Sequence, residues 1–181
     1  MEIQTIPPFL QYFANIRERT MRVARSLPAD KVDWTYAPSK FIAGDLLRHI
    51  AVTERYLFAE NIQGLPSRYT THGKELAADH AAILVLMERL HSESMDIFSQ
   101  LTDANLQEKC LNVSGSEITR WKQLRSMVEH EVHHRGQLYL YLGLLGVAAP
   151  PLYGLTSQEV RAVARPNSPL APQAPLFRLA T

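Results

Sequence analysis

Apolar side chains recur at helical spacing over four stretches of the chain, and each stretch is bounded by residues that stop a helix. Two prolines that suit a helix start open the first stretch, Pro28 closes it, and Gly146 closes the fourth. The predicted helices cover residues 7–27, 42–61, 74–101 and 118–145. Four long amphipathic helices without a convincing set of strands predict an all-α fold, a four-helix bundle.

The remaining segments are shorter or less regular. Residues 102–117 are polar and rich in turn-forming residues, which allows a short hairpin. SQEVRAVAR, residues 157–165, is typical of a short extra C-terminal helix, and the proline-rich segment after it is expected to be an extended or disordered tail. We therefore predict one domain over residues 1–165 and a tail over 166–181.

Composition excludes several classes of protein. The 181 residues are 46% hydrophobic and 20% charged, an ordinary globular balance, with a net charge of +1 and no block of Lys and Arg. Neither a nucleic-acid-binding surface nor a basic membrane-binding surface is therefore expected. No apolar run reaches about 18 residues, and the N-terminus lacks the layout of a signal peptide. The single cysteine, Cys110, fits a reducing, cytoplasmic setting and suits a connecting segment better than a catalytic thiol.

Histidines on the fourth predicted helix fall into two groups by helix phase. With His130 at 0° and about 100° per residue, the apolar positions lie between about 20° and 120°. These positions are Leu124, Met127, Leu138, Tyr141, Leu142 and Leu145. His134 falls at about 40°, inside this stripe, His130 lies at its edge, and His133 lies near 300°. Helix phase therefore selects His130 and His134 as the inward pair.

A third histidine, His49, flanks the buried face of the second predicted helix. A pair at i and i+4 stacks two imidazoles closely enough for one metal ion, and an imidazole from a facing helix would complete a three-histidine site. The alternative is a set of hydrogen-bonded structural histidines. His80 and His91 are about 16 Å apart along their helix and cannot bind one ion together, and His72 sits in a loop without a pattern around it.

Glu131 falls near 100° on the fourth helix, within the apolar stripe, where an unpaired carboxylate would be costly. It could orient a metal ligand or act as a catalytic base. Alternatively, it forms an ion pair with an arginine of another helix.

A di-iron site of the four-helix type is a competing arrangement, because it uses two Glu-x-x-His motifs and two further glutamates. The chain contains Glu88–His91 and Glu131–His134, with Glu18 and Glu54 available. Helix phase, however, directs Glu88, Glu18 and Glu54 away from the apolar faces of their helices. We therefore favour the three-histidine site.

Two stretches carry a family resemblance. LPADKVDWTYAPSKFIAGDLLRHIAVTE has a Trp–Pro connection before the histidine of the second helix, and HEVHHRGQLYLYLGLLG has a His-x-x-x-His-Arg-Gly-Gln motif in a leucine-rich helix. Together with PPLYGL, they resemble the DinB/YfiT-like family of damage-inducible bundle proteins over about residues 5–155. This resemblance implies His49, His130 and His134 as metal ligands. The family often has Trp-Ser where this chain has Phe41 and Ile42, a departure expected to leave the ligands untouched.

The resemblance further implies non-sequential helix packing, a homodimer and one divalent ion, such as zinc, nickel, manganese or iron. Some members are transferases or isomerases that use the low-molecular-weight thiols bacillithiol or mycothiol, and others are described as metal-dependent hydrolases. Arg48 and Arg135, each beside an expected ligand, are candidates for binding the carboxylates of such a thiol cofactor. The simpler interpretation is that both are solvated surface arginines.

We therefore expect a cytoplasmic metalloenzyme that acts on a small molecule, either by hydrolysis or by thiol transfer. The competing hypothesis is a non-catalytic, metal-stabilised dimer that binds a small molecule or serves in a stress response.

Overall fold

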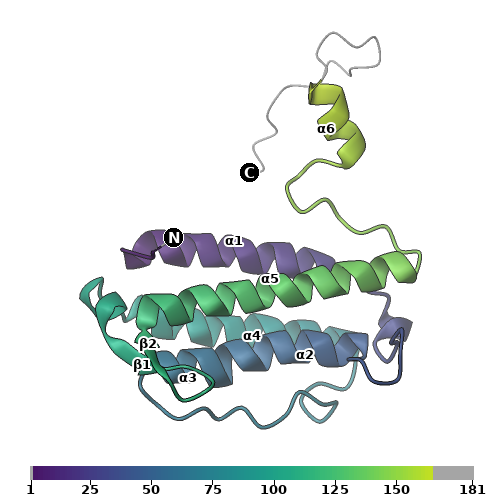
Figure 1. Ribbon diagram of the computed structural model, residues 1–181. Coiled ribbons are helices and arrows are strands. Elements are labelled where there is room, and N and C mark those ends of the chain that lie inside the picture. Colours follow the sequence, from purple (N-terminus) through teal and green to yellow (C-terminus); the bar gives the residue numbers. More distant parts are fainter. Residues whose placement is uncertain (1, 165–181) are drawn as a thin grey trace. The chain divides into compact units, whose positions relative to one another are not determined.

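The computed structural model describes residues 2–164, in which four long helices form a bundle (Figure 1). The long helices are α1 (Ile6–Arg25), α2 (Ala43–Thr53), α4 (His80–Ser99) and α5 (Arg120–Leu144). Helix α2 continues through a π-helical turn (Glu54–Phe58) into the short α3 (Ala59–Ile62). Two 3-10 turns lie at Ala29–Lys31 and Ala104–Gln107. The predicted all-α bundle is confirmed.

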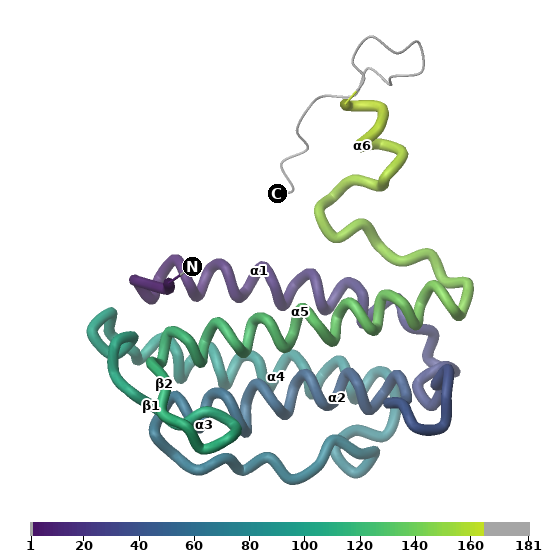
Figure 2. The backbone as a smooth tube through the Cα atoms, in the orientation of Figure 1, coloured from purple at the N-terminus to yellow at the C-terminus, as the bar shows by residue number. Residues whose placement is uncertain are grey.

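Helices that follow one another in sequence are not always neighbours in space. Both α1 and α2 pack against α4 and α5, so that α1 and α2 lie diagonally opposite (Figure 2). Fully buried side chains fill the centre, among them Phe13, Leu47, Ile83, Leu90, Leu124 and Leu138. Each such side chain contributes about 1.5–3 kcal/mol by leaving water. The diagonal placement puts α2 beside α5, the two helices that carry the three expected ligands.

The third long helix begins at His80, so the prediction of a start at Lys74 is wrong. The Asp79 side chain accepts a hydrogen bond of 2.8 Å from the backbone N–H of Ala82 and caps the helix. The preceding residues instead belong to a long loop, residues 63–79. At the other end of the bundle, Gly146 adopts φ of 69° directly after α5, a left-handed conformation that glycine adopts without strain.

The polar segment before α5 contains the expected hairpin. Strand β1 (Lys109–Leu111) pairs antiparallel with β2 (Glu117–Thr119), and Cys110 lies opposite Ile118. Periodicity assigns the last two residues of β2 to the fourth helix, and this prediction is wrong. That helix begins at Arg120, because the backbone of these two residues pairs with β1.

The chain divides into two compact units, Met1–Ala149 and Pro150–Thr181. The first contains the bundle, and the second contains α6 (Ser157–Ala164), where a short helix was predicted. The predicted tail over residues 166–181 lies outside the described residues.

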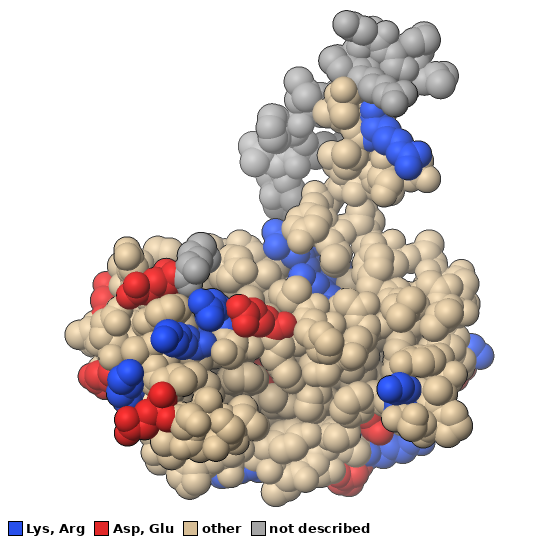
Figure 3. All heavy atoms as spheres, viewed as in Figure 1, with Lys and Arg blue, Asp and Glu red and all other residues tan. Residues whose placement is uncertain are grey.

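No helix of residues 2–164 is both long and apolar enough to cross a membrane. On the face in Figure 3, acidic and basic side chains are interspersed.

Candidate metal centre

Three imidazoles meet between α2 and α5. His49 comes from α2, and His130 and His134 lie one turn apart on α5. One ring nitrogen from each lies within 4.8 Å of the others, and Nε2 of His49 is 3.1 Å from Nε2 of His130. His134 is buried, and the other two are partly buried. The structure therefore brings together the trio that helix phase selected.

These residues fit a divalent metal ion. Metal–nitrogen bonds of about 2.0–2.1 Å in a tetrahedral site place two ligand nitrogens roughly 3.3 Å apart, close to the 3.1 Å between His49 and His130. Burial lowers the pKa of His49 to about 4 and that of His130 to about 3, with smaller contributions from neighbouring imidazoles. Burial also lowers the pKa of His134. A neutral imidazole is the form that binds a metal, and burial keeps all three rings in this form.

Nδ1 has a polar partner in two of these histidines. Nδ1 of His49 lies 3.1 Å from the Tyr69 hydroxyl and 3.3 Å from Oγ1 of Thr53. Nδ1 of His134 lies 2.7 Å from Oε1 of Gln137. Such contacts hold a metal-binding imidazole in one orientation and one tautomer.

His72 is a neighbour of the cluster that the sequence did not indicate, because it lies in a loop. Its Nδ1 lies 2.7 Å from the Tyr69 hydroxyl, and its ring centroid is 5.3 Å from that of His49. The second and third predicted helices leave only residues 62–73 between them, whereas the loop of residues 63–79 exceeds the length of about 12–15 residues above which loops are commonly functional, so this signal required the true start of α4.

An aromatic ring covers one side of the cluster. The Phe41 ring centroid lies 5.2 Å from that of His49, 5.0 Å from that of His72 and 6.2 Å from that of His134. Position 41, where the family often has tryptophan, thus contacts two of the three expected ligands, which still converge. Tyr141 holds this segment by donating a hydrogen bond of 2.8 Å to the Phe41 carbonyl.

Glu131, the candidate base, is 2% exposed and faces another helix. Its Oε2 lies 3.1 Å from Nη2 of Arg17 in α1, as the ion-pair alternative proposed. Its carboxylate is not part of the histidine cluster that could hold a metal ion among residues 2–164.

Glu54 was expected to point away from the core, and this prediction is wrong. Its carboxylate is buried, contacts Arg17 and accepts a hydrogen bond of 2.9 Å from Nδ1 of His91. The helix widens into the π-helical turn that begins at Glu54, so a constant step of 100° no longer gives the direction of the side chain. As helix phase predicted, the carboxylates of Glu18 and Glu88 are exposed.

The two candidate cofactor-binding arginines are both buried, so their interpretation as solvated surface residues is wrong. Arg48 is fully buried and donates to the carbonyls of His72 at 3.0 Å and Ala77 at 2.8 Å, and to Asp45 at 2.6 Å. Arg135 is 4% exposed and donates to the Ile16 carbonyl at 3.2 Å. Both guanidiniums thus bind backbone carbonyls of neighbouring segments.

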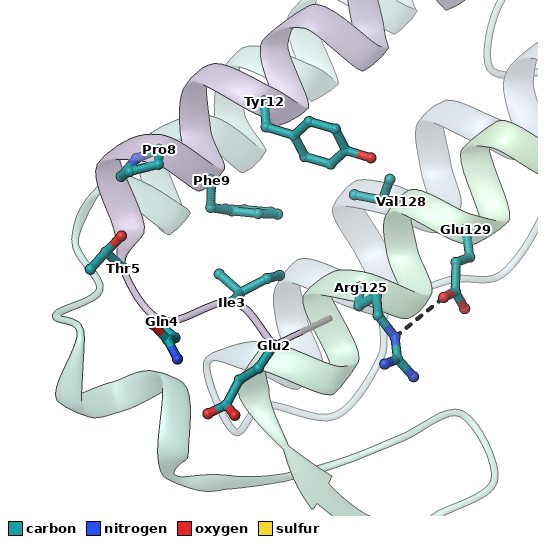
Figure 4. Close-up of a pocket in the computed structure, with 10 residues that line it drawn as sticks. All are labelled: Glu2, Ile3, Gln4, Thr5, Pro8, Phe9, Tyr12, Arg125, Val128 and Glu129. Atoms are coloured by element: carbon teal, nitrogen blue, oxygen red, sulfur yellow. Dashed lines mark ion pairs between the residues drawn. The ribbon is translucent and has the colours of Figure 1, made fainter.

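A separate hollow of about 550 Å³ lies where the N-terminal segment crosses α1 and α5 (Figure 4). Phe9, Tyr12 and Val128 form its apolar part, and Arg125 pairs with Glu129 at its edge. None of its lining residues belongs to the histidine cluster. The chemistry suggested by the imidazoles is therefore not located in this hollow.

Comparisons with known proteins agree with this architecture. The DinB family model matches residues 1–167. The uncharacterized protein YjoA of Bacillus subtilis is 27% identical over 147 residues, which span 80% of this chain and 93% of YjoA. YfiT from Bacillus subtilis, described as a probable metal-dependent hydrolase with an unusual four-helix bundle topology, has a TM-score of 0.63 at 16% identity, over 78% of this chain and 87% of YfiT.

A second solved structure is that of a mycothiol-dependent maleylpyruvate isomerase, determined as a point mutant. Its TM-score is 0.62 at 12% identity, and the match covers 80% of this chain and 62% of the isomerase. At such identities, the likeness to the two solved structures shows the fold alone.

Proposed function

Because this chain belongs to the DinB family, we propose that it is a metal-dependent enzyme that holds one divalent ion through His49, His130 and His134. The observation that carries this proposal is the convergence of three imidazole nitrogens within 4.8 Å. Imidazole ligands suit zinc, nickel and iron better than manganese, and cellular supply decides which metal is bound. Such an ion supplies positive charge that polarises a substrate carbonyl or lowers the pKa of a water or thiol.

Hydrolysis is the leading reaction in this proposal, and thiol transfer is the second. YfiT and the mycothiol-dependent isomerase share the fold, and each supports one branch. The chain's own residues act in the same way in both: the imidazoles bind the ion, Tyr69 and Gln137 orient two of them, and Phe41 shields one side from water. The substrate is a small molecule in either branch.

Metal content tests the site. Untagged, unsupplemented protein should contain about one equivalent of metal per chain by mass spectrometry, and His134→Ala should lose it. His80→Ala is the control, because His80 lies at the start of α4 and is not among the clustered histidines. Absence of metal in the wild type, with no rise in melting temperature on adding zinc or nickel, would leave the histidines as structural residues.

The metal-loaded protein then separates the reactions. Turnover of ester or amide substrates without added thiol supports hydrolysis, whereas consumption of an electrophile only with bacillithiol or mycothiol supports transfer. A bound metal without turnover in either assay would favour the non-catalytic small-molecule-binding or stress-response dimer. Arg48 and Arg135 are poor candidates for binding the carboxylates of a thiol cofactor, because their guanidiniums already bind backbone carbonyls.

A homodimer is part of the proposal, and α5 offers a surface for it. Leu140 and Leu144 lie one turn apart on α5 and are both more than half exposed. Exposed apolar side chains of this size favour burial against a second copy. Sedimentation should give a dimer for the wild type and a monomer for Leu140→Glu. An unchanged mass would exclude this surface.

We also propose a cytoplasmic location, based only on the lone Cys110.

A further inference from the structure

Tyr69 and His72 belong to the loop of residues 63–79, and hydrogen bonds to α2 and the π-helical turn anchor this loop on both sides of Tyr69. Before Tyr69, the backbone N–H of Arg68 donates to the Tyr56 carbonyl at 2.8 Å. After it, the guanidinium of Arg48 donates to the carbonyls of His72 and Ala77. Because Arg48 is fully buried on α2, the loop is fixed to the same helix that carries His49.

The geometry of His49 determines which of its nitrogens carries a proton. Nε2 lies 3.1 Å from Nε2 of His130 and is therefore the nitrogen directed into the cluster. A metal ion bound at Nε2 leaves the proton of the neutral ring on Nδ1, which must then donate. Two oxygens are within reach of Nδ1: the Tyr69 hydroxyl at 3.1 Å and Oγ1 of Thr53 at 3.3 Å.

The Tyr69 hydroxyl has a second partner that sets the direction of its own proton. Nδ1 of His72 lies 2.7 Å from this oxygen, the shortest separation in the group. If Tyr69 accepts from His49, its O–H is free to donate to His72, which then carries its proton on Nε2. Thr53 lies one turn beyond His49 on the same helix and makes no such link to the loop.

We propose that Tyr69 and His72 are positioning residues that form a one-way hydrogen-bond relay with His49, in which His49 donates to Tyr69 and Tyr69 donates to His72. This inference rests on the proposed metal site but concerns residues outside the ligand set. The relay locks the ring orientation and tautomer of His49 and makes it a stronger ligand. The relay also couples the loop to the metal ion, so that a bound ion stabilises the loop and an ordered loop strengthens metal binding.

The experiment uses zinc-loaded protein and two readouts, zinc affinity by competition with a chelating dye and the NMR signal of the His49 Nδ1 proton. We expect Tyr69→Phe to weaken zinc binding about tenfold, the lower end of the range for such partners, and to speed exchange of that proton with water. Tyr12→Phe, a change of the same kind at an exposed tyrosine of α1, should alter neither readout.

Changes at His72 test the second link. His72→Leu removes the acceptor for the Tyr69 hydroxyl and should weaken zinc binding, whereas His72→Gln provides an acceptor oxygen and should restore it. Melting temperatures of the metal-free variants show whether the bundle is intact. These two variants leave Tyr69 in place, so they test the relay even if Tyr69→Phe destabilises the loop.

The possible outcomes separate the relay from the metal site. If the wild type binds zinc, His134→Ala does not, and Tyr69→Phe binds as tightly as the wild type, the relay is wrong and the site stands. If Thr53→Val, but not Tyr69→Phe, alters the His49 proton, Thr53 is the acceptor and the relay is again overturned. Failure of the wild type itself to bind zinc would remove the proposed function and the relay with it.

Discussion

Oε2 of Glu131 lies 3.1 Å from Nη2 of Arg17, and the same guanidinium contacts the carboxylate of Glu54. One buried cation from α1 is therefore shared by two buried carboxylates, one on α5 and one at the end of α2. Glu131 follows the expected ligand His130, and Glu54 lies five residues after His49. The ion pairs thus join the two helices that carry the proposed metal site, through the centre of the bundle.

Removing Arg17 should be strongly destabilising. Arg17→Met leaves two buried carboxylates without their cation, and we expect a loss of about 3–5 kcal/mol in the free energy of unfolding. Denaturant unfolding of the metal-free protein measures this loss in the free energy of unfolding. Arg25→Met, at an exposed arginine that pairs with Glu18 and Glu88, is the control and should cost less than about 1 kcal/mol. Equal effects of the two changes would contradict a structural role for the buried pairs.

Glu131→Gln distinguishes a catalytic from a structural glutamate. Neither carboxylate oxygen of Glu131 makes an aligned hydrogen bond to a protein atom, and Arg17 keeps Glu54 as a partner in the variant. We expect the fold and the metal content to be retained. If Glu131 is the catalytic base, kcat should fall by about 100-fold or more. If it only forms the ion pair, kcat should change little.

The metal-free protein should lose stability in mild acid through its buried histidines, of which His91 lies outside the expected ligand set. Burial lowers the pKa of His91 to about 3, and the charge of Arg17 adds to this effect. Between about pH 6.5 and about pH 3, the unfolded chain binds a proton at His91 that the folded protein excludes. The free energy of unfolding therefore decreases as the pH falls through this window.

His91→Gln should reduce that dependence by about 1.4 kcal/mol per pH unit, the contribution of one proton. Glutamine retains an N–H that can donate to Glu54, so the change is conservative. Denaturant unfolding at pH 7 and pH 5 provides the comparison. A variant with the pH dependence of the wild type would show that His91 binds its proton equally well in both states.

Metal retention should extend well below the ordinary pKa of histidine. Because burial lowers the pKa of His49 to about 4 and that of His130 to about 3, protons compete for these ligands only below those values. We expect about one equivalent of zinc to survive dialysis at pH 5.5 and to be lost near pH 3. Half-release close to pH 6.5 would instead indicate ligands exposed to solvent.

The thiol of Cys110 should be unreactive in the folded protein. It is 5% exposed, and burial raises its pKa, partly opposed by the charge of Arg120. Labelling with a thiol-reactive dye should be slow in native buffer and complete in denaturant. Cys110→Ser should leave the metal content unchanged. Rapid stoichiometric labelling of the native protein would make Cys110 a candidate participant in the thiol-transfer branch.

Local periodicity determined most of the architecture and the candidate ligand set. Apolar spacing located the four helices within a few residues, except for the start of α4, which the Asp79 cap determines. His130 and His134 could be paired from sequence because two residues at i and i+4 share a face of any regular helix. The same phase argument placed His49 at the edge of a buried face.

Only the tertiary structure decided what those residues contact. Helix phase failed at Glu54, where a π-helical turn interrupts the regular step. It could not show that Arg48 is buried, because the carbonyls that bind this guanidinium come from a loop distant in sequence. For the same reason, Tyr69 and His72 were not recognised as neighbours of His49. Periodicity reports the direction of a side chain on its own helix, whereas its partner depends on which segments the packed bundle brings together.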